Sequence, residues 1–381
     1  MAAVLPRLRA FGWPLLCVAL AITIYGVTRA RRDLVDFEVY RTAAARAASG
    51  EPLYRPEDGH YQFKYLPAFA LLVAPAAWGN PEIVKVVWFG VGCGLVIVLF
   101  TRSVALLPDR RQSAARLLTL TALVTAKLWI KELVEGQTNL WLAGLIVGAL
   151  GAANRRRPLT AGCLVGLATI VKPYALVVLP WLAVAAGVPA LLSCGATVIV
   201  GLVLPAAVYG WHGDVALHLA WWRTVTETTG PNLLFAENIS IAAMWAKWIG
   251  TGSLATALAM LTSAGMLLSA LSMFARRRFV RSPSYLEVAA LLALIPFLSP
   301  QGWDYVALLG IPATMALIDR AGDVDPPWRI AAALAMVVTG FTIYDVLGRA
   351  TYLRAMSLSL LTLAGLTLIA CVVHLRWRRL A

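Results

Sequence analysis

The sequence contains little charge. Only 14% of its 381 residues are Asp, Glu, Lys or Arg, whereas 60% are hydrophobic, and the mean hydropathy is +0.76. This composition excludes an ordinary soluble globular protein and is typical of an integral membrane protein. Because unpaired backbone groups cannot face lipid, we expect an all-α polytopic membrane protein.

Common metal- and nucleotide-binding motifs are also missing. The five cysteines lie in apolar segments without a CxxC pair, and the four histidines lack metal-ligand spacing. The sequence has no P-loop, no GxGxxG after a strand and no GxSxG. We therefore predict no metal site and no cofactor, while composition leaves open whether a divalent metal assists.

Long apolar segments make up most of the chain. Since a bilayer core requires about 20 apolar residues per helix, we expect about twelve membrane spans. They lie near residues 11–28, 82–101, 117–131, 138–153, 159–171, 174–187, 188–210, 253–274, 285–299, 303–318, 330–347 and 356–374.

Clusters of basic residues at the ends of these segments predict the orientation of the chain. Arginines gather near residues 7–9, 102–116, 155–157, 276–281 and 376–379. If every segment crosses, all these clusters fall on one side, which the positive-inside rule assigns to the cytoplasm. We therefore expect a multi-pass protein of the plasma membrane with both termini in the cytoplasm.

A single membrane domain over residues 1–381 is expected, with two outer loops. Loop 29–81 opens with a predicted surface helix at 36–48, and loop 211–252 is rich in tryptophan, which favours the headgroup level of a bilayer. Much of the net charge of +14 reflects topology and contact with anionic membrane lipids, so no nucleic-acid partner is expected. Arginines and a lysine in loop 29–81 nevertheless oppose the positive-inside trend, which indicates an anionic ligand approached from outside.

Asp36 is the first candidate for chemistry. An outward-facing carboxylate near arginines can act as a general base toward a hydroxyl, while Arg31 and Arg32 bind a phosphate. A simple ion pair explains the same residues equally well. Asp33 and Glu38 compete for the role.

Three junctions between apolar segments carry further polar candidates. Gln137 and Asn139 could bind sugar hydroxyls, although capping of a helix is an equally ordinary role. Lys172 precedes a proline and could reach a phosphate as a point charge or extend to the interface. Asp304 follows Trp303, whose ring could stack on a sugar or belong to an aromatic belt.

The order of motifs resembles the glycosyltransferase family 87 proteins. The matching stretches are DFEVY at 36–40, GEPLY at 50–54, FKYLP at 63–67, GQTN at 136–139, KP at 172–173, NIS at 238–240 and SPQGW at 299–303. Together they cover roughly residues 30–315. Each is short, and the ordered set carries the resemblance.

This resemblance implies a membrane fold of the GT-C type and an α-mannosyltransferase that uses a polyprenyl-phosphate-mannose donor. The acceptor would be a hydroxyl of a glycolipid or polysaccharide on the extracytoplasmic face, and transfer would be inverting. An acidic residue in the first outer loop is expected at the active site, and here that residue is Asp36. The predicted donor-phosphate contacts are Arg31, Arg32, Lys64 and Lys172, and the predicted sugar or acceptor contacts are Tyr40, Tyr65, Gln137, Asn139, Asn238 and Trp303.

One departure bears on the mechanism. Family members often carry a histidine soon after the tryptophan of the Ser-Pro motif, where this chain has Asp304-Tyr305. Asp36 or Asp304 would then be the base. A transporter or lipid-linked sugar flippase, or a catalytically inactive partner subunit, remains an alternative, although charges gathered at one face favour chemistry at an interface.

Overall fold

The computed structural model describes residues 34–378, and this part of the chain is helical, with one isolated bridge between Asn238 and Trp303. The α-helices are α2 (Val35–Ala48), α3 (Pro67–Leu72), α4 (Pro81–Leu106), α5 (Ala114–Val124), α6 (Ala126–Glu135), α7 (Asn139–Asn154), α8 (Pro158–Val171), α9 (Leu179–Val203), α10 (Ala206–Asn232), α11 (Ile241–Ile249), α12 (Ser253–Ala275), α13 (Ser284–Leu298), α14 (Ile311–Asp319), α15 (Pro326–Phe341), α16 (Tyr344–Ser357) and α17 (Leu360–Arg378). The 3₁₀ helices are η1 (Pro56–Tyr61), η2 (Ala74–Ala77), η3 (Pro173–Val178), η4 (Arg277–Phe279), η5 (Asp304–Gly310) and η6 (Ala321–Asp323).

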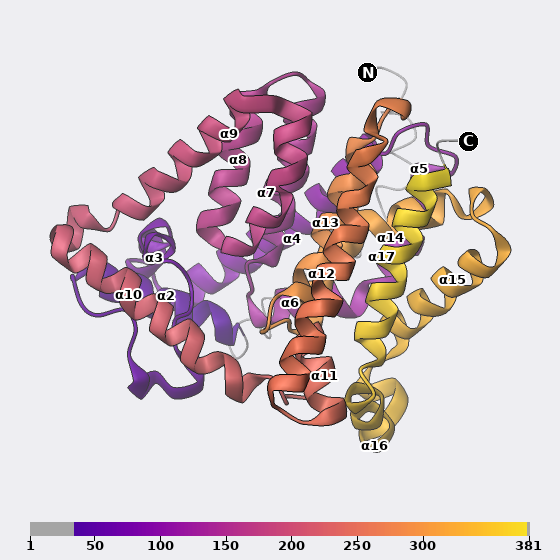
Figure 1. Ribbon diagram of the computed structural model, residues 1–381. Coiled ribbons are helices and arrows are strands. Elements are labelled where there is room, and N and C mark those ends of the chain that lie inside the picture. Colours follow the sequence, from indigo (N-terminus) through magenta and orange to yellow (C-terminus); the bar gives the residue numbers. More distant parts are fainter. Residues whose placement is uncertain (1–33, 379–381) are drawn as a thin grey trace.

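Helix α13 occupies the core. Its residues from Tyr285 to Phe297 are all buried, and it packs against α12, α17, α14 and η5. Helices α7, α8 and α9 form a second packed group on one flank, while α10 passes α2 and α3 on the same side (Figure 1). Glycines allow α8 and α9 to approach closely, since a Cβ at Gly162 would collide with the backbone of Ala190.

By length and composition, the described residues contain four candidate membrane spans. These are α4, the continuous stretch Pro173–Val203, α12 and α17. Two bent pairs raise the number to six if each pair is one span: α6 with α7, bent by 118°, and α15 with α16, bent by 106°. The chain is therefore a helical membrane protein.

The expected number of about twelve spans is not confirmed. The segments at 159–171 and 285–299 form α8 and α13, which are 14 and 15 residues long and shorter than the roughly 20 residues that a span requires. The segments at 174–187 and 188–210 meet at Gly187, whose φ of 73° interrupts the helical backbone within one stretch. The first expected span, 11–28, lies outside the described residues.

The connections that carry many of the basic residues lie at one end of the bundle. Figure 1 shows the α4–α5, α7–α8 and α12–α13 connections at that end, and α11 and α16 at the opposite end. This arrangement agrees with the clustering expected from the sequence.

Helix α2 corresponds to the surface helix expected at 36–48. It ends at Ser49 and Gly50, and Gly50 has a φ of 67° that favours glycine. Phe37, Tyr40 and Ala44 are buried, whereas Asp36 is half-buried at the first turn. The helix therefore holds a carboxylate at the edge of the core.

Candidate active site

Gln137 lies at the centre of a polar cluster that joins four separate parts of the chain. Its Nε2 donates to the Asp36 carboxylate and to the Tyr305 hydroxyl at 3.0 Å. Its Oε1 accepts from the hydroxyls of Tyr40 and Tyr65, each at 3.1 Å. These two hydroxyls also lie 2.6 Å apart. Four of the residues predicted for the site, Asp36, Tyr40, Tyr65 and Gln137, therefore lie in one cluster.

The position of Gln137 follows from the sharp break between α6 and α7. Gly136 ends α6 with a φ of 73°, and a Cβ there would lie 2.9 Å from Cβ of Phe37 on α2. Glycine is the residue that accepts this conformation without strain. The Gly136 carbonyl accepts from the Trp88 indole at 2.9 Å, so α4 secures the same turn.

Lys172 enters the cluster from the end of α8. Its Nζ donates to Asn139 Oδ1 at 2.7 Å and to Gln137 Oε1 at 3.4 Å. Asn139 in turn donates through Nδ2 to Glu132 Oε2 at 2.8 Å, and the Leu140 backbone N–H donates to the other oxygen at 3.1 Å. A buried carboxylate and a buried ammonium are thus linked through an amide, and each has hydrogen-bond partners.

Glu132 is the participant that the sequence reasoning missed. It is fully buried in α6 and supports Asn139 from behind. An ionisable residue beside a long apolar segment was the signal that could have indicated it. Tyr305 was also missed, because an aromatic belt accounted for it equally well.

The environment of Asp36 has opposing effects on the charge of its carboxylate. Burial raises the pKa of its carboxyl above the ordinary value, while the Gln137 hydrogen bond and the charges of Lys172, His60 and Lys64 oppose that rise. A carboxylate with a raised pKa is a better proton acceptor than an ordinary aspartate. Asp36 is half-buried, so part of the residue stays in contact with solvent.

Lys64 approaches the cluster from the segment after η1. Burial lowers the pKa of its ammonium, and the charge of Asp36 opposes that effect. The Lys64 carbonyl accepts from the Trp221 indole at 3.1 Å, which ties this segment to α10. The other two expected phosphate contacts, Arg31 and Arg32, lie outside residues 34–378.

Asp304 occupies a different environment from Asp36. Its side chain is fully buried and forms ion pairs with Lys127 and Lys131, each at 2.9 Å. Two cations and no exposed surface make this carboxylate a counter-ion inside the protein, so the geometry favours Asp36 over Asp304 as a base. Asp304 still adjoins the cluster through the next residue, Tyr305.

Asn238 and Trp303 belong to the loop that positions Asp304. The Asn238 amide donates to the carbonyls of Asn232 at 3.0 Å and Pro300 at 2.8 Å, and its Oδ1 accepts from the Ser240 backbone at 3.0 Å. With its amide used in this way and buried, Asn238 stabilises the loop and is not among the hydrogen-bond partners of Gln137. The Trp303 ring is half-buried, with its centroid 5.9 Å from that of Phe235.

Among residues 34–378, no group of three or more His, Cys, Asp or Glu side chains is arranged to bind a metal ion. The described cluster offers a half-buried carboxylate, amide and phenol hydrogen bonds, and nearby lysines.

The fold and the site together define a helical membrane protein with a polar cluster suited to group transfer to a hydroxyl. The model of glycosyltransferase family 87 matches residues 63–300, and the chain belongs to this family. It is accordingly a membrane glycosyltransferase. No curated protein and no solved structure gave a match.

The matched region contains much of the cluster, including Tyr65, Gln137 and Lys172. It begins after Asp36 and ends before Asp304. The structure, and not the family match, therefore connects Asp36 to the family region, through its hydrogen bond with Gln137.

Proposed function

We propose that this protein transfers a sugar, mannose, from a polyprenyl-phosphate donor to an acceptor hydroxyl, with Asp36 as the general base. The observation that carries the proposal is the half-buried Asp36 carboxylate, bound by the Gln137 amide, with two lysines close enough to affect its charge. A sugar acceptor on a glycolipid or polysaccharide provides the hydroxyl.

The reaction that fits this arrangement is a single displacement with inversion. Asp36 accepts the proton of the acceptor hydroxyl while the hydroxyl oxygen bonds to the anomeric carbon. The bond from that carbon to the phosphate oxygen breaks, and polyprenyl phosphate leaves with one more negative charge than it carried in the donor. Lysines near the leaving phosphate stabilise that charge, which reduces the need for an acid partner. Lys64 and Lys172 are proposed to provide this stabilising positive charge. Arg31 and Arg32 are proposed to bind the same phosphate.

The tyrosines of the cluster are proposed to position the sugar. The Tyr65 ring packs at 4.9 Å from the ring of Phe69, and its hydroxyl takes part in the Gln137 network. Tyr65 is half-buried, whereas Tyr40 is buried, so Tyr65 is proposed to contact the sugar and Tyr40 to support it. Gln137 and Asn139 are proposed to align the same sugar, and Trp303 to stack on it.

The basic connections support a proposal for the side of the membrane. These lie at the end of the bundle opposite α11 and α16, and the positive-inside rule assigns such clusters to the cytoplasm. The proposed active site is therefore extracytoplasmic, in the plasma membrane, with both termini in the cytoplasm. Membership of a glycosyltransferase family favours this enzyme over a sugar transporter or flippase.

The test is a transfer assay in membranes with radiolabelled polyprenyl-phospho-mannose, and polyprenyl-phospho-glucose as a competing donor. Asp36→Asn should reduce transfer by about 10² to 10⁴-fold, the range for loss of a general base. Glu57→Gln removes an exposed carboxylate from the same outer segment and serves as the matched control. Full activity of Asp36→Asn at normal protein levels contradicts the role of Asp36, and transfer of glucose alone contradicts mannose as the sugar.

A further inference from the structure

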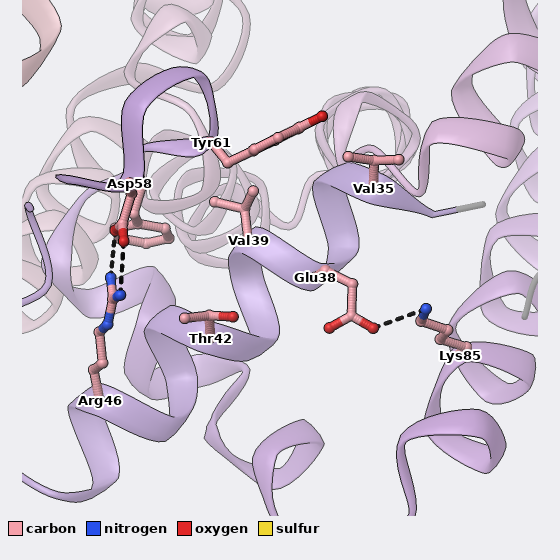
Figure 2. A pocket seen from close by; sticks show the side chains of 9 residues that line it. Val35, Glu38, Val39, Thr42, Arg46, Asp58, Tyr61 and Lys85 are labelled. Atoms are coloured by element: carbon pink, nitrogen blue, oxygen red, sulfur yellow. Dashed lines mark hydrogen bonds and ion pairs between the residues drawn. The ribbon is translucent and has the colours of Figure 1, made fainter. Parts of the chain in front are cut away.

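A groove of about 430 Å³ runs along the face of α2 beside the one that carries Asp36. Val35, Glu38, Val39, Thr42 and Arg46 line it from the helix, as Figure 2 shows. The opposite wall consists of Asp58 and Tyr61 from η1, Phe63 from the segment after η1, and Lys85 from α4. The volume falls within the range of small-ligand sites.

The charges of the groove cancel in pairs. Arg46 binds Asp58 in a bidentate pair at 2.5 and 2.8 Å, and Lys85 pairs with Glu38 at 2.8 Å. Figure 2 shows both pairs at the wall of the groove. Since each cation already has a carboxylate, the groove is poorly suited to a phosphate or an anionic headgroup. Fixed charged groups, with donors and acceptors already oriented, are instead suited to hydroxyl groups of a neutral ligand.

An aromatic ring and apolar side chains complete the lining. Tyr61 is 55% exposed, and Val35 and Val39 lie along the helix beneath it. A sugar ring has apolar C–H faces and hydroxyl edges, so it matches a groove that presents both kinds of surface. The exposed Thr42 hydroxyl adds one more hydrogen-bonding group.

The groove and the candidate active site share a wall. On α2, Asp36 lies between the groove residues Val35 and Glu38, which is within one helical turn of about 5.4 Å. The chain from His60 to Lys64 also borders both sites. His60 and Lys64 act electrostatically on Asp36, whereas Tyr61 and Phe63 face the groove. Because Val35 precedes Asp36 in α2, the Val35 end of the groove is the end nearest the proposed base.

We propose that this groove is an acceptor subsite, which binds a sugar unit adjacent to the unit whose hydroxyl reacts at Asp36. The inference rests on the proposed function and adds to it that the acceptor is a glycan of at least two sugar units. The protein would then be an enzyme that extends an existing oligosaccharide.

The experiment compares octyl α-mannoside with octyl α-mannobioside as acceptors, in membranes that contain the full chain and polyprenyl-phospho-mannose. The wild-type protein should show a higher kcat/KM for the disaccharide. Thr42→Trp, which fills the groove, should abolish this gain through the acceptor KM and leave the donor KM unchanged. Ala48→Trp places the same bulk at an exposed position of α2 outside the groove lining and is the matched control.

A second variant removes the aromatic ring without adding bulk. Tyr61→Ala should reduce the disaccharide gain by about threefold to tenfold, the range expected for loss of one aromatic contact. Because Tyr61 is exposed, its truncation should remove little packing and leave the protein folded. An immunoblot should then show wild-type levels of the variant in the membrane.

The outcomes separate the two proposals. A wild-type protein that uses the disaccharide no better than the monosaccharide overturns the subsite. So does a rise in the donor KM of Thr42→Trp, which would place the donor in the groove. Absence of transfer from the polyprenyl-phosphate donor to any acceptor, endogenous glycans included, overturns the proposed function instead.

Discussion

The side-chain amide of Gln137 can adopt one orientation, and in that orientation it donates to Asp36. Tyr40 and Tyr65 direct their hydroxyls at Oε1, and Lys172 approaches the same oxygen. The Nε2 atom must then face the carboxylate and the Tyr305 hydroxyl. The amide thus binds one oxygen of the Asp36 carboxylate, and no other hydrogen bond of this carboxylate involves residues 34–378.

Replacing Gln137 with leucine should lower transfer by about 10 to 100-fold, the range for a hydrogen bond to a charged group. The change should also alter the pH dependence. The Gln137 hydrogen bond lowers the pKa of Asp36, so its loss raises that pKa further. Asp36 then becomes ionised at higher pH, and the acidic limb of the kcat/KM profile moves to higher pH. A profile that stays in place would show that Asp36 does not titrate in the reaction.

Lys172→Met should destabilise the protein, because it leaves the Glu132 charge buried without its cation. Removal of one partner of a buried pair typically costs about 3 to 5 kcal/mol. The double variant Lys172→Met with Glu132→Gln should recover part of that loss. Thermal unfolding in detergent measures the stability of the single and of the double variant. Equal stability of the single and double variants would show that Glu132 and Lys172 are not coupled through Asn139.

Asp304→Asn should affect stability more than the acid–base chemistry. The substitution leaves Lys127 and Lys131 with less compensation in a buried site, at a cost of about 3 to 5 kcal/mol. The protein that still folds should keep the acidic limb of the wild-type pH profile, because that limb belongs to Asp36. Loss of the limb in Asp304→Asn would assign the base to Asp304 instead.

Gly136→Ala should impair both folding and transfer. An alanine at a φ of 73° costs about 1 to 2 kcal/mol, and its Cβ would press on Phe37 and displace the neighbouring Gln137. Gly50→Ala is the matched control, since Gly50 has a φ of 67° but open space around it. Both variants should lose stability in a thermal unfolding assay, and Gly136→Ala alone should lose transfer activity. Equal activity of the two would show that the position of Gln137 is not critical.

The sequence was informative about the motif residues and less so about their surroundings. Asp36, Gln137 and Lys172 were selected from short polar motifs, and the structure brings all three into one network. The buried support from Glu132 was not foreseen, although an acid beside a long apolar segment is itself a sign of a functional or buried polar site. The sequence did contain a signal for the ion pairs of Asp304. Lys127 and Lys131 are four residues apart, so they lie on one face of a helix and can bind the same carboxylate.

The number of membrane spans was the property that the sequence predicted least well. Apolar content marks each segment that avoids water, but it does not distinguish a full crossing from a short core helix such as α13. The break at Gly187 and the bend after Gly136 depend on backbone angles. These angles cannot be inferred from amino-acid composition.

The partners in the cluster are far apart in the sequence, and this separation matters for how the protein is made. Asp36 and Gln137 are 101 residues apart, and Gln137 and Tyr305 are separated by 168. During synthesis, the early segments enter the bilayer long before Tyr305 leaves the ribosome, so the network closes late. A nascent chain that stops before this residue has the acid and the amide but lacks the contact that completes the network. Assembly order thus delays completion of this polar cluster until most of the protein has been inserted.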